Sequence, residues 1–260
     1  MSDKVIAKPS SGCCLRGTIH EGEAKGRIEK IVNVETYIAE PSAENANGNI
    51  VLFFPDVFGL WINNNLLVDA FAAAGYLTLA PDYFRGDPVW KHKKDLSDTN
   101  DNPDFDFPGW LAKHRAFSDP FVPKFVEEVK SKYGKSDTKY TCVGYCYGAP
   151  YVMDQLSDKG ICSAGAFAHP AFLKESHFEN LTKPLFLSCS EIDQTFPKEF
   201  RRRAIDIMDE HKKRYSLQLF QEVSHGFALR ADLSDDWQKH CKEMSFQGIQ
   251  EWFDWWSAKK

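Results

Sequence analysis

The segment Gly144-Tyr145-Cys146-Tyr147-Gly148 follows the β-branched and aromatic run 139–143 and precedes an apolar stretch that opens with Pro150. This order predicts a strand, a sharp turn and a helix. The two glycines remove side chains that would collide where strand and helix converge, and so permit strained backbone at the turn. Such a turn holds a sulfur outward for attack on an acyl carbon. We therefore interpret Cys146 as a nucleophile, with a small buried hydrophobic residue as the alternative.

Apolar strand patterns and helical patterns alternate along most of the chain. Strands are expected at 33–39, 49–54, 76–80, 139–143, 164–168, 185–190 and 216–221, and helices at 64–74, 120–133, from 149 onward, 198–213 and 234–256. We interpret the stretch 91–108 as a long loop near a site. Such alternation indicates an α/β fold in which helices cover both faces of a mostly parallel sheet. Reactive groups then gather at the carboxyl ends of the strands.

Composition limits the class of protein. The 260 residues are 43% hydrophobic, which suits one α/β domain over 1–260. The net charge is -5, and residues of both signs are interspersed along the chain, which indicates no nucleic-acid partner. The apolar runs are too short to span a membrane. The seven cysteines are irregularly spaced, which does not suit a disulfide framework. We expect a cytoplasmic protein, either a monomer or a homodimer.

Two later strands are each followed by a side chain that suits a nucleophile's partner. Asp193 follows the sixth expected strand, and His225 follows the seventh. A cysteine nucleophile needs a base within hydrogen-bond reach and a group that orients this base. The order nucleophile, acid, histidine is that of the α/β-hydrolase arrangement. We expect Cys146, Asp193 and His225 to act together, with Glu191 and His169 as the competing acid and histidine.

Several further motifs accompany these residues. They are Cys13-Cys14 with Gly17-Thr18-Ile19-His20, Pro55-Asp56-Val57-Phe58-Gly59, Ala80-Pro81-Asp82-Tyr83-Phe84 followed by Gly86-Asp87-Pro88, Gly144-Tyr145-Cys146-Tyr147-Gly148-Ala149, Ile192-Asp193 and His225-Gly226-Phe227. Together they make the sequence resemble the dienelactone hydrolase family, specifically its fungal branch, over nearly its whole length. The resemblance implies an α/β-hydrolase fold and a Cys146, His225, Asp193 triad that opens an enol-lactone such as dienelactone. We expect a thioester intermediate and no cofactor or metal.

The developing oxyanion needs hydrogen-bond donors. The elbow geometry supplies the backbone N–H of Tyr147, and the resemblance points to Val57 for the other donor. Asp56 lies where bacterial relatives carry a glutamate that accepts a hydrogen bond from the resting thiol. Because aspartate is one methylene shorter, an Asx turn before Gly59 is the alternative for Asp56.

The substrate-binding residues are expected from position and chemistry. Arg85 lies near the family's arginine for the substrate carboxylate, although the spacing is one residue shorter. Arg230 is a second carboxylate clamp, because a guanidinium can grip a carboxylate through two hydrogen bonds. Gly226 replaces a serine of the bacterial enzymes, which removes a polar contact. Tyr145 and Phe58 suit an apolar pocket wall. The expected partner is thus a small, anionic lactone or ester.

Two other features have structural interpretations. Cys13-Cys14 lacks the C-x-x-C spacing of a metal site. We interpret it as a packed structural segment rather than as a metal-binding site or an oxidant sensor. The aromatic run 251–256 fits a helical core stripe better than a membrane-surface helix. Two alternative functions stay open: a thioesterase or carboxylesterase of general metabolism, and a redox-sensing or ligand-binding protein that uses Cys146 without catalysis.

Overall fold

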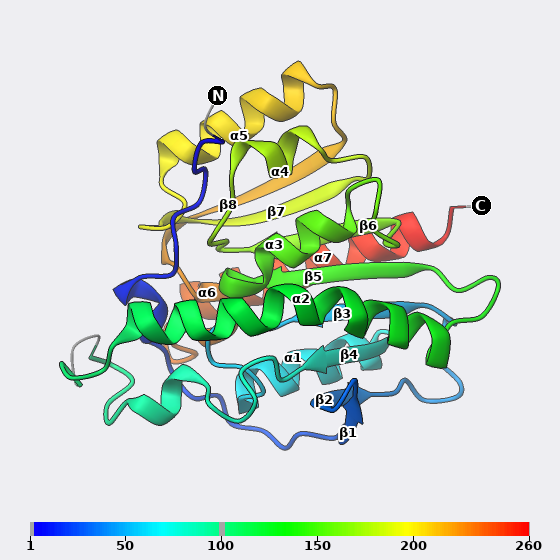
Figure 1. Cartoon of the computed structure of the whole chain (residues 1–260), viewed down its shortest axis with the longest axis horizontal. Coiled ribbons are helices and arrows are strands. Elements are labelled where there is room, and N and C mark those ends of the chain that lie inside the picture. Colours follow the sequence, from blue (N-terminus) through cyan, green and yellow to red (C-terminus); the bar gives the residue numbers. More distant parts are fainter. Residues whose placement is uncertain (1–2, 99–101, 260) are drawn as a thin grey trace.

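The computed structural model of the chain describes residues 3–98 and 102–259. One eight-stranded sheet crosses the molecule in the order β1-β2-β4-β3-β5-β6-β7-β8 (Figure 1). The strands are β1 (Arg27–Ile31), β2 (Val34–Ala39), β3 (Ile50–Phe54), β4 (Leu77–Pro81), β5 (Tyr140–Tyr145), β6 (Ala164–Ala168), β7 (Leu185–Ile192) and β8 (Tyr215–Ser224). The β1–β2 and β2–β4 pairs are antiparallel and the other pairs are parallel. The α/β class expected from the alternating pattern is therefore confirmed.

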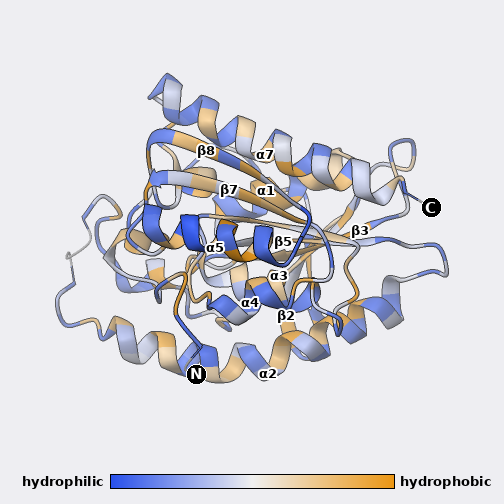
Figure 2. Cartoon of the chain, turned by 90° about the horizontal axis from the view of Figure 1, so that it is seen from above, coloured by the Kyte–Doolittle hydropathy of each residue, from blue (hydrophilic) through white to orange (hydrophobic). Residues whose placement is uncertain are grey.

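Helices cover both faces of the sheet. They are α1 (Ile62–Ala73), α2 (Phe107–Tyr133), α3 (Ala149–Gln155), α4 (Glu175–Glu179), α5 (Lys198–Glu210), α6 (Phe227–Arg230) and α7 (Asp236–Ser257), with short 3-10 turns η1 (Gly12–Leu15), η2 (Val89–His92) and η3 (Cys146–Gly148). One apolar core lies under α2 to α5, and the other lies under α1, α6 and α7 (Figure 2). The alternation of side chains along the buried strands supplies both cores.

The expected strands all form, and most of their ends agree within two residues. The strand β8 continues to Ser224, three residues beyond its expected end. The strand β1 was not expected, because its short polar run Arg27–Ile31 carries only two apolar residues. It is stable because it pairs with β2 at the edge of the sheet.

The largest difference is in α2, which begins at Phe107 rather than at Pro120. Proline favours the first turn of a helix, so Pro120 looked like a start. The helix instead begins where Asp106 accepts a hydrogen bond from Gly109 N, and it buries Trp110 in its first turn. Tertiary burial thus outweighs the local helix-breaking preference of proline.

The carboxyl ends of the parallel strands meet at one edge of the sheet, and the amino-terminal segment 3–20 runs over this edge. Ile6 N donates to Leu173 O at 2.7 Å, Lys8 N donates to Thr195 O at 2.7 Å, and Thr18 N donates to Arg230 O at 3.3 Å. The segment therefore crosses the loops that follow β6, β7 and β8. In the described part of the chain, no helix is both long and apolar enough to span a bilayer.

Candidate active site

Cys146 lies at the sharp turn between β5 and α3 and has a φ of 49°, in the left-handed region that ordinary residues rarely adopt. The flanking glycines make this turn possible. A Cβ on Gly144 would lie 2.6 Å from the carbonyl oxygen of Gly148, and a Cβ on Gly148 would collide with the carbonyl oxygen of Phe54. The steric reason inferred from the sequence therefore holds at both positions.

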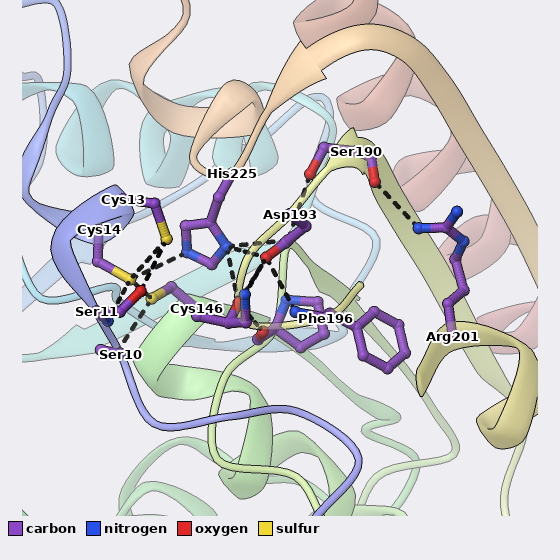
Figure 3. A network of polar contacts seen from close by, with 12 residues as sticks. Ser10, Ser11, Cys13, Cys14, Cys146, Ser190, Asp193, Phe196, Arg201 and His225 are labelled. Atoms are coloured by element: carbon purple, nitrogen blue, oxygen red, sulfur yellow. Dashed lines mark hydrogen bonds and ion pairs between the residues drawn. The ribbon is translucent and has the colours of Figure 1, made fainter. Parts of the chain in front are cut away.

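Asp193 and His225 come together from the loops after β7 and β8 (Figure 3). His225 Nδ1 lies 3.0 Å from both carboxylate oxygens of Asp193, and both side chains are buried. Thr195 donates its backbone N–H and its hydroxyl to Asp193 Oδ1, at 2.8 and 2.7 Å. Asp193 is thus held so that it orients the imidazole and leaves Nε2 free for other contacts.

The pair is electrostatically coupled. Burial alone would lower the pKa of His225, but the Asp193 carboxylate, followed by Cys14, raises that pKa well above its usual value. Burial alone would raise the pKa of Asp193, but His225 and the hydrogen bonds from Thr195 and Phe196 hold it well below its usual value. His225 therefore has a strong tendency to hold a proton beside an ionised carboxylate.

Cys14 Sγ lies between His225 and Cys146. It is 3.4 Å from His225 Nε2 and 3.5 Å from Cys146 Sγ, which donates to it (Figure 3). Ser10 Oγ contacts Cys146 Sγ from the same segment at 3.5 Å. The imidazole and the nucleophile candidate are therefore joined through a second thiol rather than by a direct hydrogen bond. This position of Cys14 was not predicted from the sequence.

Asp56 and Arg230 form a buried ion pair. Asp56 Oδ1 also accepts hydrogen bonds from Phe58 N at 3.1 Å and from Asn64 Nδ2 at 3.0 Å, so the Asx turn of the alternative interpretation is present. In the described residues the polar contacts of Asp56 go to these groups and not to the Cys146 thiol. Burial lowers the pKa of Arg230, to about 10, which leaves the guanidinium charged at neutral pH.

The expected oxyanion donors lie on adjacent elements. Val57 follows β3 and Tyr147 follows β5, and these two strands pair in parallel with Phe54 opposite Gly144. Both residues are fully buried. The structure therefore brings the loop that carries Val57 beside the turn that carries Tyr147, as a two-donor oxyanion hole requires.

The other residues expected to contact the substrate do not all lie near the triad residues. Phe58 packs against Trp61 with tilted rings whose centroids are 4.8 Å apart, and it lies under the Arg230 guanidinium at 4.6 Å. Tyr145 belongs to the core on the opposite side of the sheet from Cys146, because side chains alternate along β5. Arg85 stacks on Phe117 and lines a separate surface pocket with Asp82 and Lys30. The structure thus brings Phe58 and Arg230 near the triad residues but not Tyr145 or Arg85.

The competing acid and histidine have other surroundings. Glu191 is exposed and accepts a hydrogen bond from Glu222 N at 2.9 Å. His169 is fully buried beside His225, with ring centroids 4.9 Å apart, and burial lowers its pKa well below the usual value. Neither ring nitrogen of His169 has a hydrogen-bond partner in the described residues. Asp193 and His225 are therefore the pair that geometry favours.

A cavity of about 260 Å³ opens beside this site, and Cys13, Arg16, His225 and Arg230 are among its lining residues. Cys146 is fully buried and does not line it. The segment that carries Cys14 separates the nucleophile candidate from this cavity. Access to Cys146 therefore requires movement of Cys14 or of its segment.

Sequence reasoning missed two residues of the site, Cys14 and Thr195. Cys14 was interpreted as part of a packed segment, and it is indeed fully buried. The only signal was that Cys13-Cys14 formed part of the family resemblance. Thr195 carried no signal, since a threonine two residues after an aspartate is common in turns.

A mostly parallel sheet with a cysteine elbow, and with an acid and a histidine after later strands, defines the class of α/β hydrolases. The chain matches the model of the dienelactone hydrolase family over residues 34–257. It is 47% identical to dienlactone hydrolase 1 of Gibberella moniliformis, covering 100% of this chain and 99% of that protein. It is 42% identical to dienlactone hydrolase 2 of the same organism, covering 99% and 100%.

A solved structure shows the same fold. The dienelactone hydrolase-like promiscuous phosphotriesterase from metagenomic libraries superimposes with a TM-score of 0.66 at 14% identity, covering 86% of this chain and 92% of that one. The chain belongs to the dienelactone hydrolase family. This membership assigns it to the hydrolases of carboxylic esters, the reaction class expected from the sequence.

Proposed function

We propose that the protein opens small enol-lactones or activated esters with Cys146 as nucleophile and a thioester as intermediate. The observation that carries the proposal is the continuous contact chain from Cys146 through Cys14 and His225 to Asp193. Each link lies within hydrogen-bond range for its atoms, and all four side chains are buried. A buried chain of this kind can move a proton away from the attacking sulfur.

The reaction begins with proton transfer. The Cys146 proton passes to Cys14 Sγ while the Cys14 proton passes to His225 Nε2, which leaves a Cys146 thiolate and an imidazolium stabilised by Asp193. Movement of Cys14 then admits the substrate. The thiolate attacks the lactone carbonyl, and the N–H groups of Tyr147 and Val57 stabilise the oxyanion. Losing one such donor typically costs about 3 kcal/mol of transition-state stabilisation.

The second half releases the acid. The carbon–oxygen bond of the lactone breaks, the enolate takes a proton from the imidazolium, and the acyl group stays on Cys146 as a thioester. His225 then takes a proton from water as the water attacks the thioester. The carbon–sulfur bond then breaks, and the imidazolium returns its proton to the Cys146 sulfur. The products are the carboxylic acid and the free thiol. An enolate is a good leaving group, so a thiolate nucleophile suffices.

We also propose a substrate with a carboxylate, and Arg230 rather than Arg85 as the residue that binds it. Arg230 lines the cavity beside His225, whereas Arg85 lines a pocket shared with none of the triad residues. Arg230 is already paired with Asp56. An incoming carboxylate would therefore compete with Asp56 for the guanidinium, and its binding would free Asp56 to move.

Replacement of the nucleophile tests the mechanism. Cys146→Ala should lower kcat on dienelactone and on p-nitrophenyl acetate by about 10³-fold or more. Cys162→Ala, which removes a buried thiol of the same core, is the matched control. A quenched wild-type reaction with p-nitrophenyl acetate should carry one acetyl group on the Cys146 peptide by mass spectrometry. Undiminished turnover in Cys146→Ala would rule this nucleophile out.

A panel of substrates is needed to identify the substrate class, because a thioesterase or a carboxylesterase would use the same catalytic groups. Purified protein should be assayed against lactones, aryl esters and acyl thioesters, each with and without a free carboxylate. We expect the highest kcat/KM for carboxylate-bearing enol-lactones. Preference for acyl thioesters would overturn the lactone assignment without affecting the role of Cys146.

A further inference from the structure

Two thiols and an imidazole lie close together within the site. The Sγ atoms of Cys13 and Cys14 are 4.0 Å apart, and Cys14 Sγ is 3.4 Å from His225 Nε2. These three ligand atoms all lie within 4.8 Å of one another. We propose that Cys13, Cys14 and His225 form a binding site for a thiophilic divalent cation, of which Zn²⁺ is the type.

The distances between donors match what zinc requires. Zinc binds thiolate sulfur at about 2.3 Å and imidazole nitrogen at about 2.0–2.1 Å in a tetrahedral arrangement. Two sulfurs on such an ion are about 3.8 Å apart, and a sulfur and a nitrogen are about 3.5 Å apart. The observed separations of 4.0 and 3.4 Å are within a few tenths of an ångström of these values. The third pair, Cys13 Sγ and His225 Nε2, lies within 4.8 Å, so rotation of the Cys13 side chain toward His225 is needed to close the site.

The surroundings of His225 also suit a metal ligand. Its Nδ1 is hydrogen-bonded to Asp193, which fixes the ring with Nε2 directed at Cys14 Sγ. Histidine ligands of zinc usually have a carboxylate at the other ring nitrogen, and this contact raises their basicity. The same Asp193 contact that serves catalysis therefore serves metal binding.

Charge and access are compatible with an ion. Two thiolates, a neutral imidazole and Zn²⁺ sum to zero, so the complex adds no net charge to a buried site. Cys13 and His225 both line the cavity of about 260 Å³, which gives an ion a route from solvent and leaves its fourth position open to water. Binding releases the two thiol protons and any proton on His225 Nε2, so affinity rises with pH.

The consequence for the enzyme rests on the proposed function. An ion on His225 Nε2 and Cys14 occupies two links of the proton path from Cys146, so the loaded enzyme does not turn over. The site is thus a means by which a thiophilic metal switches the hydrolase off, and removal of the ion by a chelator restores activity.

Binding is tested without reference to activity. Fully reduced protein, with all seven thiols counted, is titrated with CoCl₂ and then with ZnCl₂. We expect near-ultraviolet thiolate-to-cobalt bands at one ion per chain that Zn²⁺ abolishes. Cys13→Ser should weaken Zn²⁺ binding by about 100-fold or more. Cys241→Ser, which changes a buried thiol in α7, should bind like the wild type.

Two results would overturn the proposal. One is the absence of thiolate-to-cobalt bands in the reduced wild-type protein. The other is unchanged Zn²⁺ affinity in Cys13→Ser, which would assign any bound ion to other ligands. Failure of the proposed function appears differently, because a protein whose Cys146→Ala variant stays active would still show the cobalt bands.

Discussion

At the scale of single residues, the position of Cys14 bears on how Cys146, the proposed nucleophile, would lose its proton. A thiol that contacts both Cys146 Sγ and His225 Nε2 can relay the proton between them, or it can obstruct their approach. The two roles predict opposite effects of removing its sulfur. The hydrogen-bond direction from Cys146 to Cys14 favours the relay.

Cys14→Ala should therefore lower kcat by about 10²-fold or more, the usual contribution of a positioned proton-transfer group. Cys14→Ser keeps a group that both donates and accepts, and should recover part of this loss. Single-turnover kinetics with p-nitrophenyl acetate would measure the acylation step directly. Faster acylation in Cys14→Ala would mean that Cys14 obstructs the site.

The coupling of Asp193 and His225 predicts a pH effect. The carboxylate raises the pKa of His225, and the base must be unprotonated to accept a proton. Asp193→Asn removes the negative charge, so the pKa of His225 should fall and the acid limb of kcat/KM should move to lower pH. The plateau of kcat should drop by up to about 10⁴-fold, because the imidazole loses its orienting group. An unmoved acid limb would contradict this origin of the shift.

Chain order and local geometry were sufficient to predict where Cys146, Asp193 and His225 lie, whereas their catalytic roles stay predictions. Cys146, Asp193 and His225 follow strands whose ends share one edge, and a parallel sheet brings such ends together. Cys14 could not be predicted in this way, because it lies on an irregular segment whose path depends on tertiary contacts. The proposed metal site could not be predicted either, because Cys13 and His225 are far apart in the chain and do not have the spacing of a metal-binding motif.

At the scale of elements, the elbow depends on contact between the turn and β3. Gly148 packs so closely that a Cβ would meet the carbonyl oxygen of Phe54 in the neighbouring strand. The backbone cannot move there without disturbing the β3–β5 register that places Val57 beside Tyr147, the two proposed oxyanion donors. The glycine therefore serves both stability and the position of Val57.

Gly148→Ala should lower the free energy of unfolding by about 3 kcal/mol, the upper range for overpacking, and should reduce activity. Gly48→Ala is the matched control, because a Cβ there meets nothing within 4 Å although φ is +78°. It should lower stability by only about 1–2 kcal/mol through backbone strain and leave kcat unchanged. Urea denaturation of both variants measures the difference. Equal losses would mean that the elbow glycine is needed for conformation alone.

Regular elements were predictable to the extent that burial followed the local pattern. The strands β3 and β6 are continuous apolar runs, and the sequence located them closely. The predicted start of α2 was wrong because Pro120 resembles the first residue of a helix. Only the burial of Trp110 in the structure reveals the earlier first turn. The edge strand β1 was missed because it is held by pairing and not by its own hydrophobicity.

At the scale of the whole molecule, the segment 3–20 covers the Cys146 thiol and lies outside the part of the chain that matches the family model. The match begins at residue 34, whereas Cys14 and Ser10 contact the Cys146 thiol. The segment is held to the loops after β6 and β7 by backbone hydrogen bonds and by the buried side chain of Ile6. Substrate entry therefore competes with the packing of this segment.

Alkylation of Cys146 by iodoacetamide should report this competition, because the thiol is fully buried while the segment is in place. Ile6→Ala removes contacts made only in the covered state and should speed alkylation by about 30-fold, equivalent to about 2 kcal/mol. Ile19→Ala is the matched control, since Ile19 is 59% exposed on the same segment. Peptide mass spectrometry separates Cys146 from Cys241, a buried thiol in α7 that reports global unfolding. If Ile6→Ala accelerated both thiols equally, exposure would come from unfolding of the whole chain; a selective effect on Cys146 means that the segment opens by itself.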